Sequence, residues 1–193
     1  MLRALFTLLF SKKVPDLPHL PTPKPTPAPE KPSEPRWLTF ARNEIGFRET
    51  GTNRGIERYI VDAKTGQLGD PWCAIFVNAM LERSGVRGTR SAMARSFETS
   101  PHFVRLKTPG VGTIATMWRV SRTGGLGHVF FPTGIDAQGR IWGIGGNEND
   151  GVREVPHDPS RIVGYYAPKG VRVAFKALAR VSGAGQAIST KEV

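Results

Sequence analysis

The pattern of apolar and polar positions divides the middle of the chain into a helical part and a strand part. Apolar residues at helical spacing predict helices over residues 37–45, 55–63, 70–83 and 91–97. Short apolar or alternating runs between glycine-rich turns predict strands over residues 111–120, 127–135, 140–146, 152–155 and 161–167. Helices followed by strands are typical of an α+β fold, with the helices packed on an antiparallel sheet of about five strands.

The two ends of the chain have a different composition. Nine of the 16 prolines lie within residues 15–35, which predicts an extended, proline-rich linker. Residues 1–14 are a short apolar and basic N-terminus, interpreted either as a surface-lying amphipathic anchor or as a frayed end. Residues 169–193 are a basic tail, in which 171–181 predict a short helix and the remainder is expected to be mobile. One domain, residues 36–168, is expected between them.

The composition narrows the classes of function. Apolar residues make up 39% of the chain, which is enough for a packed core. The single cysteine excludes an intramolecular disulfide framework and a multi-cysteine zinc site. The formal net charge of +11 predicts a polyanionic partner: nucleic acid, anionic lipid or an acidic wall polymer. This excess divides as +2 over residues 1–35, +5 over 36–168 and +4 over 169–193, so more than half of it lies on the two ends.

The cysteine lies at the start of the third predicted helix. Asp70 is a favoured N-cap and Pro71 is favoured at the first helical position, so Cys73 is expected at the third helical position. Unpaired backbone N–H groups and the positive end of the helix dipole meet in this first turn, where they lower the pKa of a thiol and can hold an oxyanion. A buried and inert thiol is the alternative interpretation.

Four histidines are candidates for a base that activates the thiol. His19 lies in the proline-rich linker, and His102 and His157 lie in expected loops. His128 alone lies at the start of an apolar run that predicts a strand. A core histidine with a satisfied hydrogen bond is the alternative for His128.

The strand of His128 is expected to form a hairpin with the next strand, through a turn centred between residues 137 and 138. This register places His128 opposite Asn147, whose amide oxygen can accept from the imidazole and fix its tautomer. A shift of one residue brings Glu148 opposite His128 instead. Three glycines would keep the sheet face beside His128 open to a helix end or a substrate chain: Gly143, Gly145 and Gly146.

Four short motifs follow one another in the order found in a known superfamily. They are Trp72-Cys73-Ala74-Ile75-Phe76-Val77-Asn78, a Gly88-Thr89 to Ser96 segment with Ser91-Ala92 and Ala94-Arg95, Gly127-His128-Val129, and Gly145-Gly146-Asn147. Together they resemble the NlpC/P60 and CHAP superfamily of peptidoglycan hydrolases, which share a papain-like core. The nearest resemblance is to a CHAP-like branch with the motif Trp-Cys-Ala-x-Phe-Val-Asn.

The resemblance implies a cysteine peptidase or amidase domain that cleaves an amide bond of the murein stem peptide. It implies Cys73 as the nucleophile, His128 as the base and Asn147 as the residue that orients the base. Typical NlpC/P60 members instead have Asp-Cys-Ser-Gly at the nucleophile and often a histidine as the third member. Many CHAP domains carry a carboxylate near the asparagine, for which Glu148 is the candidate here. An endopeptidase and an N-acetylmuramoyl-L-alanine amidase both remain open.

Four side chains near the motifs are candidates for substrate binding: Asp70, Trp72, Arg95 and Glu148. Asp70 would bind a free amine of the stem peptide unless it only caps the helix, and Trp72 would stack on sugar unless it lies in the core. Arg95 would bind a substrate carboxylate unless it is only solvated. Residues 147–151 lack the ligand pattern of an EF-hand loop, so no metal and no cofactor is expected.

Two other functions fit parts of the sequence, a basic nucleic-acid-binding protein and a catalytically inactive wall-binding module. Basic residues within 36–168 are scattered among 12 acidic ones without a nucleic-acid-binding pattern. We therefore expect a protein that acts on peptidoglycan, in the periplasm or cell wall. It is expected to be a monomer whose two ends make loose contact with anionic membrane or wall polymers. Delivery by a phage, injection as an effector and N-terminal anchoring all remain open, because residues 1–14 lack the pattern of a signal peptide.

Overall fold

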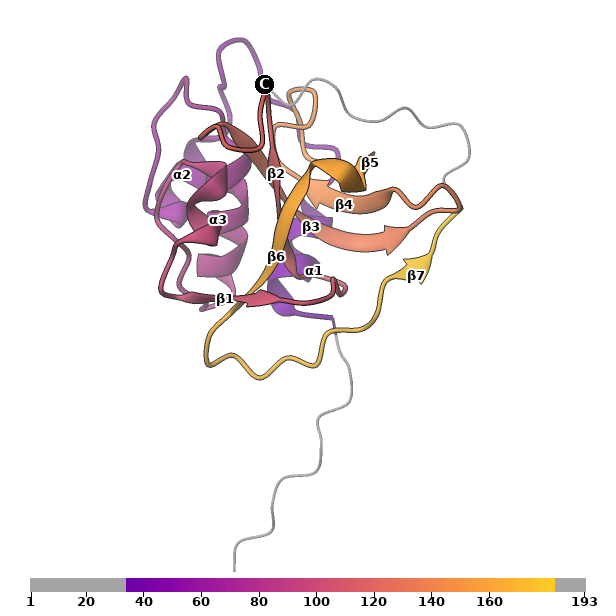
Figure 1. Cartoon of the computed structure of the whole chain (residues 1–193). Helices are drawn as coiled ribbons and strands as arrows, with labels where there is room; N and C mark the ends of the chain where they lie inside the picture. The colour runs from indigo at the N-terminus through magenta and orange to yellow at the C-terminus, as the bar shows by residue number, and fades with distance from the viewer. Residues whose placement is uncertain (1–33, 183–193) are drawn as a thin grey trace, which may run out of the picture.

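The computed structural model describes residues 34–182, in which three α-helices precede the main strands (Figure 1). The helices are α1 (Arg36–Asn43), α2 (Glu57–Ala63) and α3 (Cys73–Arg83), followed by the 3₁₀-helix η1 (Ala94–Glu98). The first three expected helices are therefore confirmed, with somewhat different ends. The expectations for residues 1–14, for linker residues 15–33 and for tail residues 183–193 lie outside the described residues.

Within residues 34–182, seven strands form one sheet, in which every pair but one is antiparallel. They are β1 (Phe103–Leu106), β2 (Ile114–Trp118), β3 (Gly127–Ile135), β4 (Ile141–Gly145), β5 (Arg153–His157), β6 (Ile162–Pro168) and β7 (Ala179–Arg180), with the 3₁₀-helix η2 (Pro159–Arg161) before β6. The spatial order is β1-β6-β2-β3-β4-β5, and β7 pairs with β3 in parallel. The α+β class and the five expected strands are confirmed, whereas β1 and β7 were not predicted.

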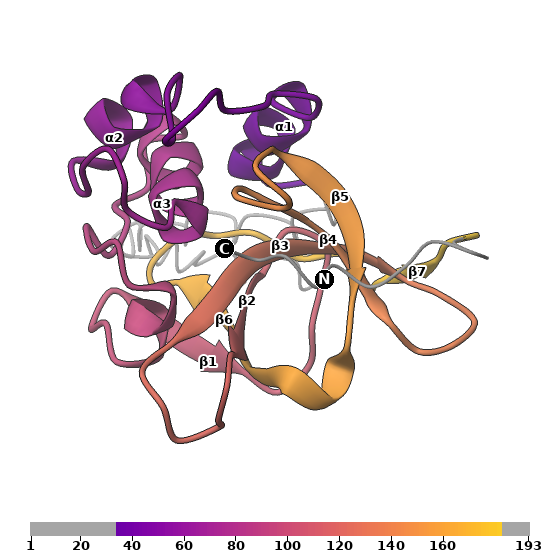
Figure 2. The same ribbon diagram turned by 90° about the horizontal axis from the view of Figure 1, so that it is seen from above.

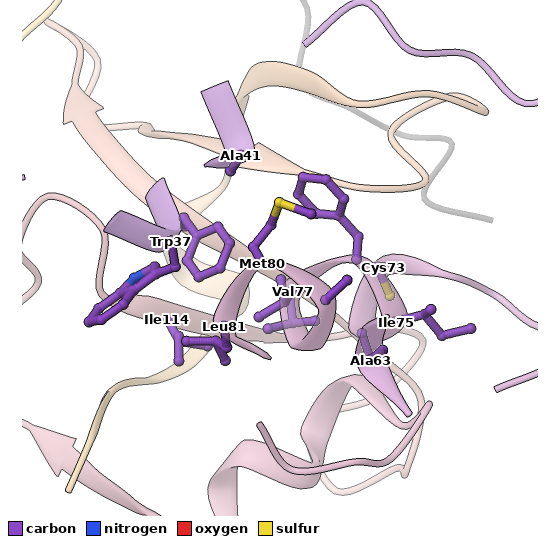
Figure 3. Close-up of a cluster of buried hydrophobic side chains, with 14 of the residues drawn as sticks. Trp37, Ala41, Ala63, Cys73, Ile75, Val77, Met80, Leu81 and Ile114 are labelled. Atoms are coloured by element: carbon purple, nitrogen blue, oxygen red, sulfur yellow. The ribbon is translucent and has the colours of Figure 1, made fainter. Parts of the chain in front are cut away.

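Helix α3 is the centre of the core. Nine of its 11 residues, Cys73 to Leu81, are buried. Such a helix must be covered on every side, because burial of apolar surface is the main favourable contribution to folding. Figure 2 shows the three helices together on one side of the sheet. Figure 3 shows side chains of α1 (Trp37, Ala41), α2 (Ala63) and β2 (Ile114) gathered around α3.

One polar side chain lies within this buried helix and connects it to the next segment of the chain. Asn78 Nδ2 donates to the carbonyls of Ala74 (2.9 Å) and Ser91 (3.1 Å), and Asn78 Oδ1 accepts from the backbone N–H of Thr89 at 2.6 Å. A Cβ at Gly88 would overlap the Asn78 side chain. The amide thus fixes residues 88–91 against α3, because it pairs with the partly buried backbone groups of Thr89 and Ser91.

The chain after β6 is extended, and the helix expected over residues 171–181 is wrong. Phe175 packs on Trp37 with ring centroids 6.3 Å apart, and the Lys176 carbonyl accepts from the Val111 N–H at 2.8 Å. Val173 also packs against the main core, two residues before Phe175. This spacing of two is that of an extended segment, in which alternate side chains face one side. Residues 171–181 therefore pack along the domain and include β7.

The helix expected over residues 91–97 is replaced by the shorter 3₁₀-helix η1. Its N-cap residue is Met93 and makes no side-chain cap. The Ser91 hydroxyl accepts from the Met93 N–H at 3.2 Å, so it closes a local turn before the helix. Within residues 34–182, no helix is long and apolar enough to cross a membrane.

We expect the substitution Asn78→Ala to lower the free energy of unfolding by about 1–3 kcal/mol, because it removes the hydrogen bonds to the partly buried backbone of Thr89 and Ser91. Urea unfolding followed by circular dichroism measures this change. The control is Asn43→Ala, on the exposed end of α1, which should change the free energy by less than about 0.5 kcal/mol. Equal effects of the two substitutions would contradict the role assigned to Asn78.

Candidate active site

Cys73 is the first residue of α3 and its side chain lies at the end of the core cluster (Figure 3). The carbonyl of Trp72 accepts the first helical hydrogen bond, from the Phe76 N–H at 2.9 Å. The N–H groups of the first helical turn have no acceptor within the helix. They and the positive end of the helix dipole therefore lie beside the Cys73 side chain, where they can hold negative charge that develops during a reaction.

The expected N-cap at Asp70 is wrong by two residues. Trp72 is the N-cap residue, and no side chain caps α3. The Asp70 carboxylate instead accepts from the Gln67 N–H at 3.0 Å, and the Asp70 carbonyl accepts from Asn53 Nδ2 at 2.6 Å. Asp70 therefore closes the turn before the helix, and Cys73 occupies the first helical position rather than the third. The thiol nevertheless stays within the first turn, as the sequence predicts.

His128 lies near the start of β3 and pairs with a carboxylate in the protein interior. Its Nε2 lies 2.6 Å from Glu148 Oε1, and the two side chains are 1% and 0% exposed. Because Nε2 faces Glu148, Nδ1 is the nitrogen left for the thiol of Cys73, which lies near enough to the ring to help raise the pKa of His128. Cys73, His128 and Glu148 therefore form a continuous chain of a thiol, an imidazole and a carboxylate.

The charge state of His128 follows from these partners. Burial alone would lower the pKa of the imidazole, since it penalises the charged form. The negative charge of Glu148 and the hydrogen bonds to Cys73 and Glu148 act in the opposite direction and raise the pKa of His128 well above its ordinary value. The imidazolium form is thus favoured at neutral pH, and Glu148 is its main source of stabilisation.

The hairpin register is confirmed in its middle but does not extend to the expected pair. Phe131 lies opposite Ile144 and Pro132 opposite Gly143, as predicted, before a bulge shifts the register toward the turn. Strand β4 ends at Gly145, and the backbone of Asn147 is left-handed, with φ at 58°. The chain therefore turns after β4, and Glu148 is the residue whose side chain meets His128.

The glycines after β4 let the helix and the hairpin come together, as expected. A Cβ at Gly146 would lie 2.7 Å from Trp72 Cζ3 and equally close to Phe76 Cγ. A Cβ at Gly145 would lie 2.7 Å from Glu148 Oε1 and 3.1 Å from His128 Nε2. Only glycine fits at either position without displacing these neighbours. The two glycines therefore allow Cys73 and His128 to approach each other.

His157 is the residue of this site that the sequence interpretation missed. It was expected in a loop between Pro156 and Pro159, but it is the last residue of β5 and is fully buried. Its Nε2 lies 3.4 Å from Glu148 Oε1, and its ring stacks on Phe130 with centroids 3.8 Å apart. The signal in the sequence was weak, because β5 contains a proline, which normally argues against a strand.

Trp72 lies in the core and not at a groove rim. Its side chain is fully buried and stacks on Tyr59 at an interplanar angle of 13°. Its indole Nε1 donates to the Glu49 carboxylate. The expectation that Trp72 stacks on sugar is therefore wrong, because no face of the ring reaches the surface.

Arg95 reaches the edge of the site through its hydrocarbon stem. A Cβ at Gly127, the residue before His128, would lie 2.7 Å from Arg95 Cγ. The guanidinium pairs with Glu98 at 2.8 Å and donates to the Arg122 carbonyl at 3.0 Å. Arg95 thus holds the loop between β2 and β3 against η1, next to the strand that carries His128.

The chain was compared with protein-family models, with curated proteins and with solved structures, and none of the three comparisons found a match.

Replacing Glu148 by glutamine should lower the pKa of His128, because it removes the negative charge that favours the imidazolium. The titration midpoint of the His128 ring, followed by NMR, should fall toward about 6.5, the ordinary value for histidine. Glu154→Gln on β5 removes a carboxylate that faces Arg42 and should leave the midpoint unchanged. An unchanged midpoint in Glu148→Gln would show that Glu148 does not set the charge of His128.

Proposed function

We propose that this protein is a cysteine-dependent hydrolase that cleaves an amide bond of the murein stem peptide. The observation that carries the proposal is the chain from Cys73 through His128 to the buried Glu148. A nucleophile at a helix N-terminus, a base in contact with it and a third group that orients the base are the parts that nucleophilic acyl transfer requires. We also propose that the helices and the sheet of this domain have the papain-like arrangement that the four motifs imply.

The reaction begins from the ion pair in which the proton of Cys73 lies on Nδ1 of His128, so the nucleophile is a thiolate beside an imidazolium. The sulfur attacks the amide carbonyl, and the first-turn N–H groups of α3 hold the oxyanion that forms. The C–N bond breaks as His128 gives its proton to the leaving amine, and a thioester remains on Cys73. A water molecule then gives a proton to His128 and attacks the thioester, which releases the acid and restores the thiolate beside the imidazolium.

Glu148 takes the orienting role in this mechanism. Its carboxylate accepts from Nε2 of His128, which leaves Nδ1 free to exchange the proton with the thiol. Asn147 was the expected orienting residue, and its backbone turn is what brings Glu148 to the histidine. We therefore propose that Asn147 shapes the backbone turn of the site and that Glu148 orients the base.

The substrate class is inferred from the four motifs that resemble peptidoglycan hydrolases. Peptidoglycan in the periplasm or cell wall is the proposed substrate, and the basic ends of the chain are proposed to add loose attraction to anionic wall polymers or membrane. Asp70 and Arg95 flank the catalytic elements and are proposed to meet charged groups of the stem peptide. The scissile bond, within the stem peptide or between it and the glycan, is open.

Nucleic-acid binding is less well supported by the arrangement of charge. Several basic side chains of the helical region are paired with acids, which lowers the net positive field that a phosphate backbone would meet. These pairs are Arg58 with Glu44, Arg83 with Glu44 and Asp62, and Lys64 and Arg90 with Glu82. Much of the positive charge of the helical region is thus neutralised within mixed networks.

Purified murein with a covalently bound dye tests the function. The wild-type chain should release dye, and the substitutions Cys73→Ala and His128→Ala should each lower the rate by at least ~10³-fold, since each removes a group required in the same step. His102→Gln changes a histidine in the loop before β1 and should retain the wild-type rate.

Thermal melts should show that the two inactive variants remain folded. Dye release by either variant at the wild-type rate would contradict the mechanism. Salt-sensitive DNA binding without any release of dye would favour the nucleic-acid alternative.

A further inference from the structure

A second feature of the site is a cluster of three donor groups beneath the catalytic cysteine. His128, Glu148 and His157 are buried, and one ligating atom from each lies within 4.8 Å of the other two. The Glu148 oxygen Oε1 stands between the two imidazoles, 2.6 Å from Nε2 of His128 and 3.4 Å from Nε2 of His157. The mechanism proposed above uses His128 and Glu148 but gives His157 no role.

The donor set is one that binds zinc. Two imidazoles and one carboxylate hold the ion in a class of zinc sites, whereas magnesium and calcium prefer oxygen ligands alone. A tetrahedral zinc ion with bonds of about 2.1 Å spaces its ligand atoms by roughly 3.4 Å. The distance from His157 to Glu148 already has this value, and the His128–Glu148 distance has to widen by less than about 1 Å.

The surroundings hold the three donor side chains in place. His157 is held by its stacking on Phe130, which itself stacks on His128 with ring centroids 6.1 Å apart. Gly145 lies next to two of the donor atoms, and any Cβ there would come within 2.7 Å of Glu148 Oε1. The rings are therefore oriented in advance, and the missing side chain of Gly145 lets His128 and Glu148 bring their donor atoms together without a steric clash.

We propose that His128, Glu148 and His157 bind a divalent ion of the zinc class, and that the bound ion holds the enzyme inactive. On binding, a bond forms between the ion and Nε2 of His128, and the proton of Nε2 leaves to solvent. The neutral ring then keeps its one proton on Nδ1 and has no lone pair to accept the proton of Cys73. The inactivation rests on the proposed function, whereas the binding itself does not.

Calorimetric titration of zinc chloride into the full chain, freed of metal beforehand with a chelator, tests the binding. We expect one ion per chain with slow onset, because all three donors are buried. His157→Gln and His157→Phe should each weaken binding by more than the ~10–100-fold that the loss of an outer-shell partner costs. The phenylalanine variant preserves the stacking on Phe130, so it can be used to test zinc binding if the glutamine variant folds poorly.

Two control variants separate this site from other ways of binding zinc. Cys73→Ala should bind zinc as the wild type does, because the sulfur is not a ligand, and His102→Gln should do the same. The proposal is overturned if the wild type binds no zinc up to millimolar concentration. It is equally overturned if Cys73→Ala abolishes binding while the His157 variants keep it, since the ion would then sit between the thiol and His128.

Dye release from murein tests the inactivation. Incubation with zinc should stop release in the wild type, and a chelator should restore it, whereas a folded His157 variant that still releases dye should require at least tenfold more zinc. Activity that is lost with the chelator and regained with zinc would overturn the inhibitory role. If no form of the protein releases dye, the proposed function fails, while the calorimetric result still decides whether the metal site exists.

Discussion

The burial of α3 on every side is the constraint on which the rest of the structure depends. A helix with buried side chains all along its length must be enclosed, so α1, α2 and the sheet are packed around it. The one part of such a helix that can take part in chemistry is its end, where backbone N–H groups lack partners. Cys73 stands at that end, and the same packing that stabilises the domain therefore positions the candidate nucleophile.

A second constraint comes from the polar groups that this packing encloses. Glu148 is fully buried, and a buried carboxylate is tolerated only with compensating partners. His128 and His157 both face it, and Gly145 leaves the space that the three side chains fill. The cost of burying the carboxylate is thus offset by the imidazolium that the proposed reaction needs. The same three groups form the donor set inferred to bind zinc.

Much of this arrangement could be predicted from the sequence, because the signals were local and periodic. Three features each depend on a single element or turn. They are the apolar run of α3, the strand that begins beside His128 and the glycines that follow β4. The partner of His128 could not be fixed in this way, since it depends on a left-handed residue, Asn147, at which the chain leaves the strand register. His157 was missed because its strand contains Pro156, and the extended course of residues 171–181 depends on tertiary contacts alone. The partner of His128, the place of His157 and the course of residues 171–181 therefore depend on turns and long-range packing, which a local sequence pattern does not encode.

The central claim is that the thiol of Cys73 performs the chemistry on murein, and the single cysteine of the chain allows a direct test. Methyl methanethiosulfonate modifies thiols reversibly, so intact-mass spectrometry can measure the modified fraction in the same sample that is assayed for dye release. We expect the rate to fall in proportion to the modified fraction, to reach zero at one adduct per chain, and to return when a reductant removes the adduct. Murein hydrolysis at the original rate by fully modified protein would contradict it.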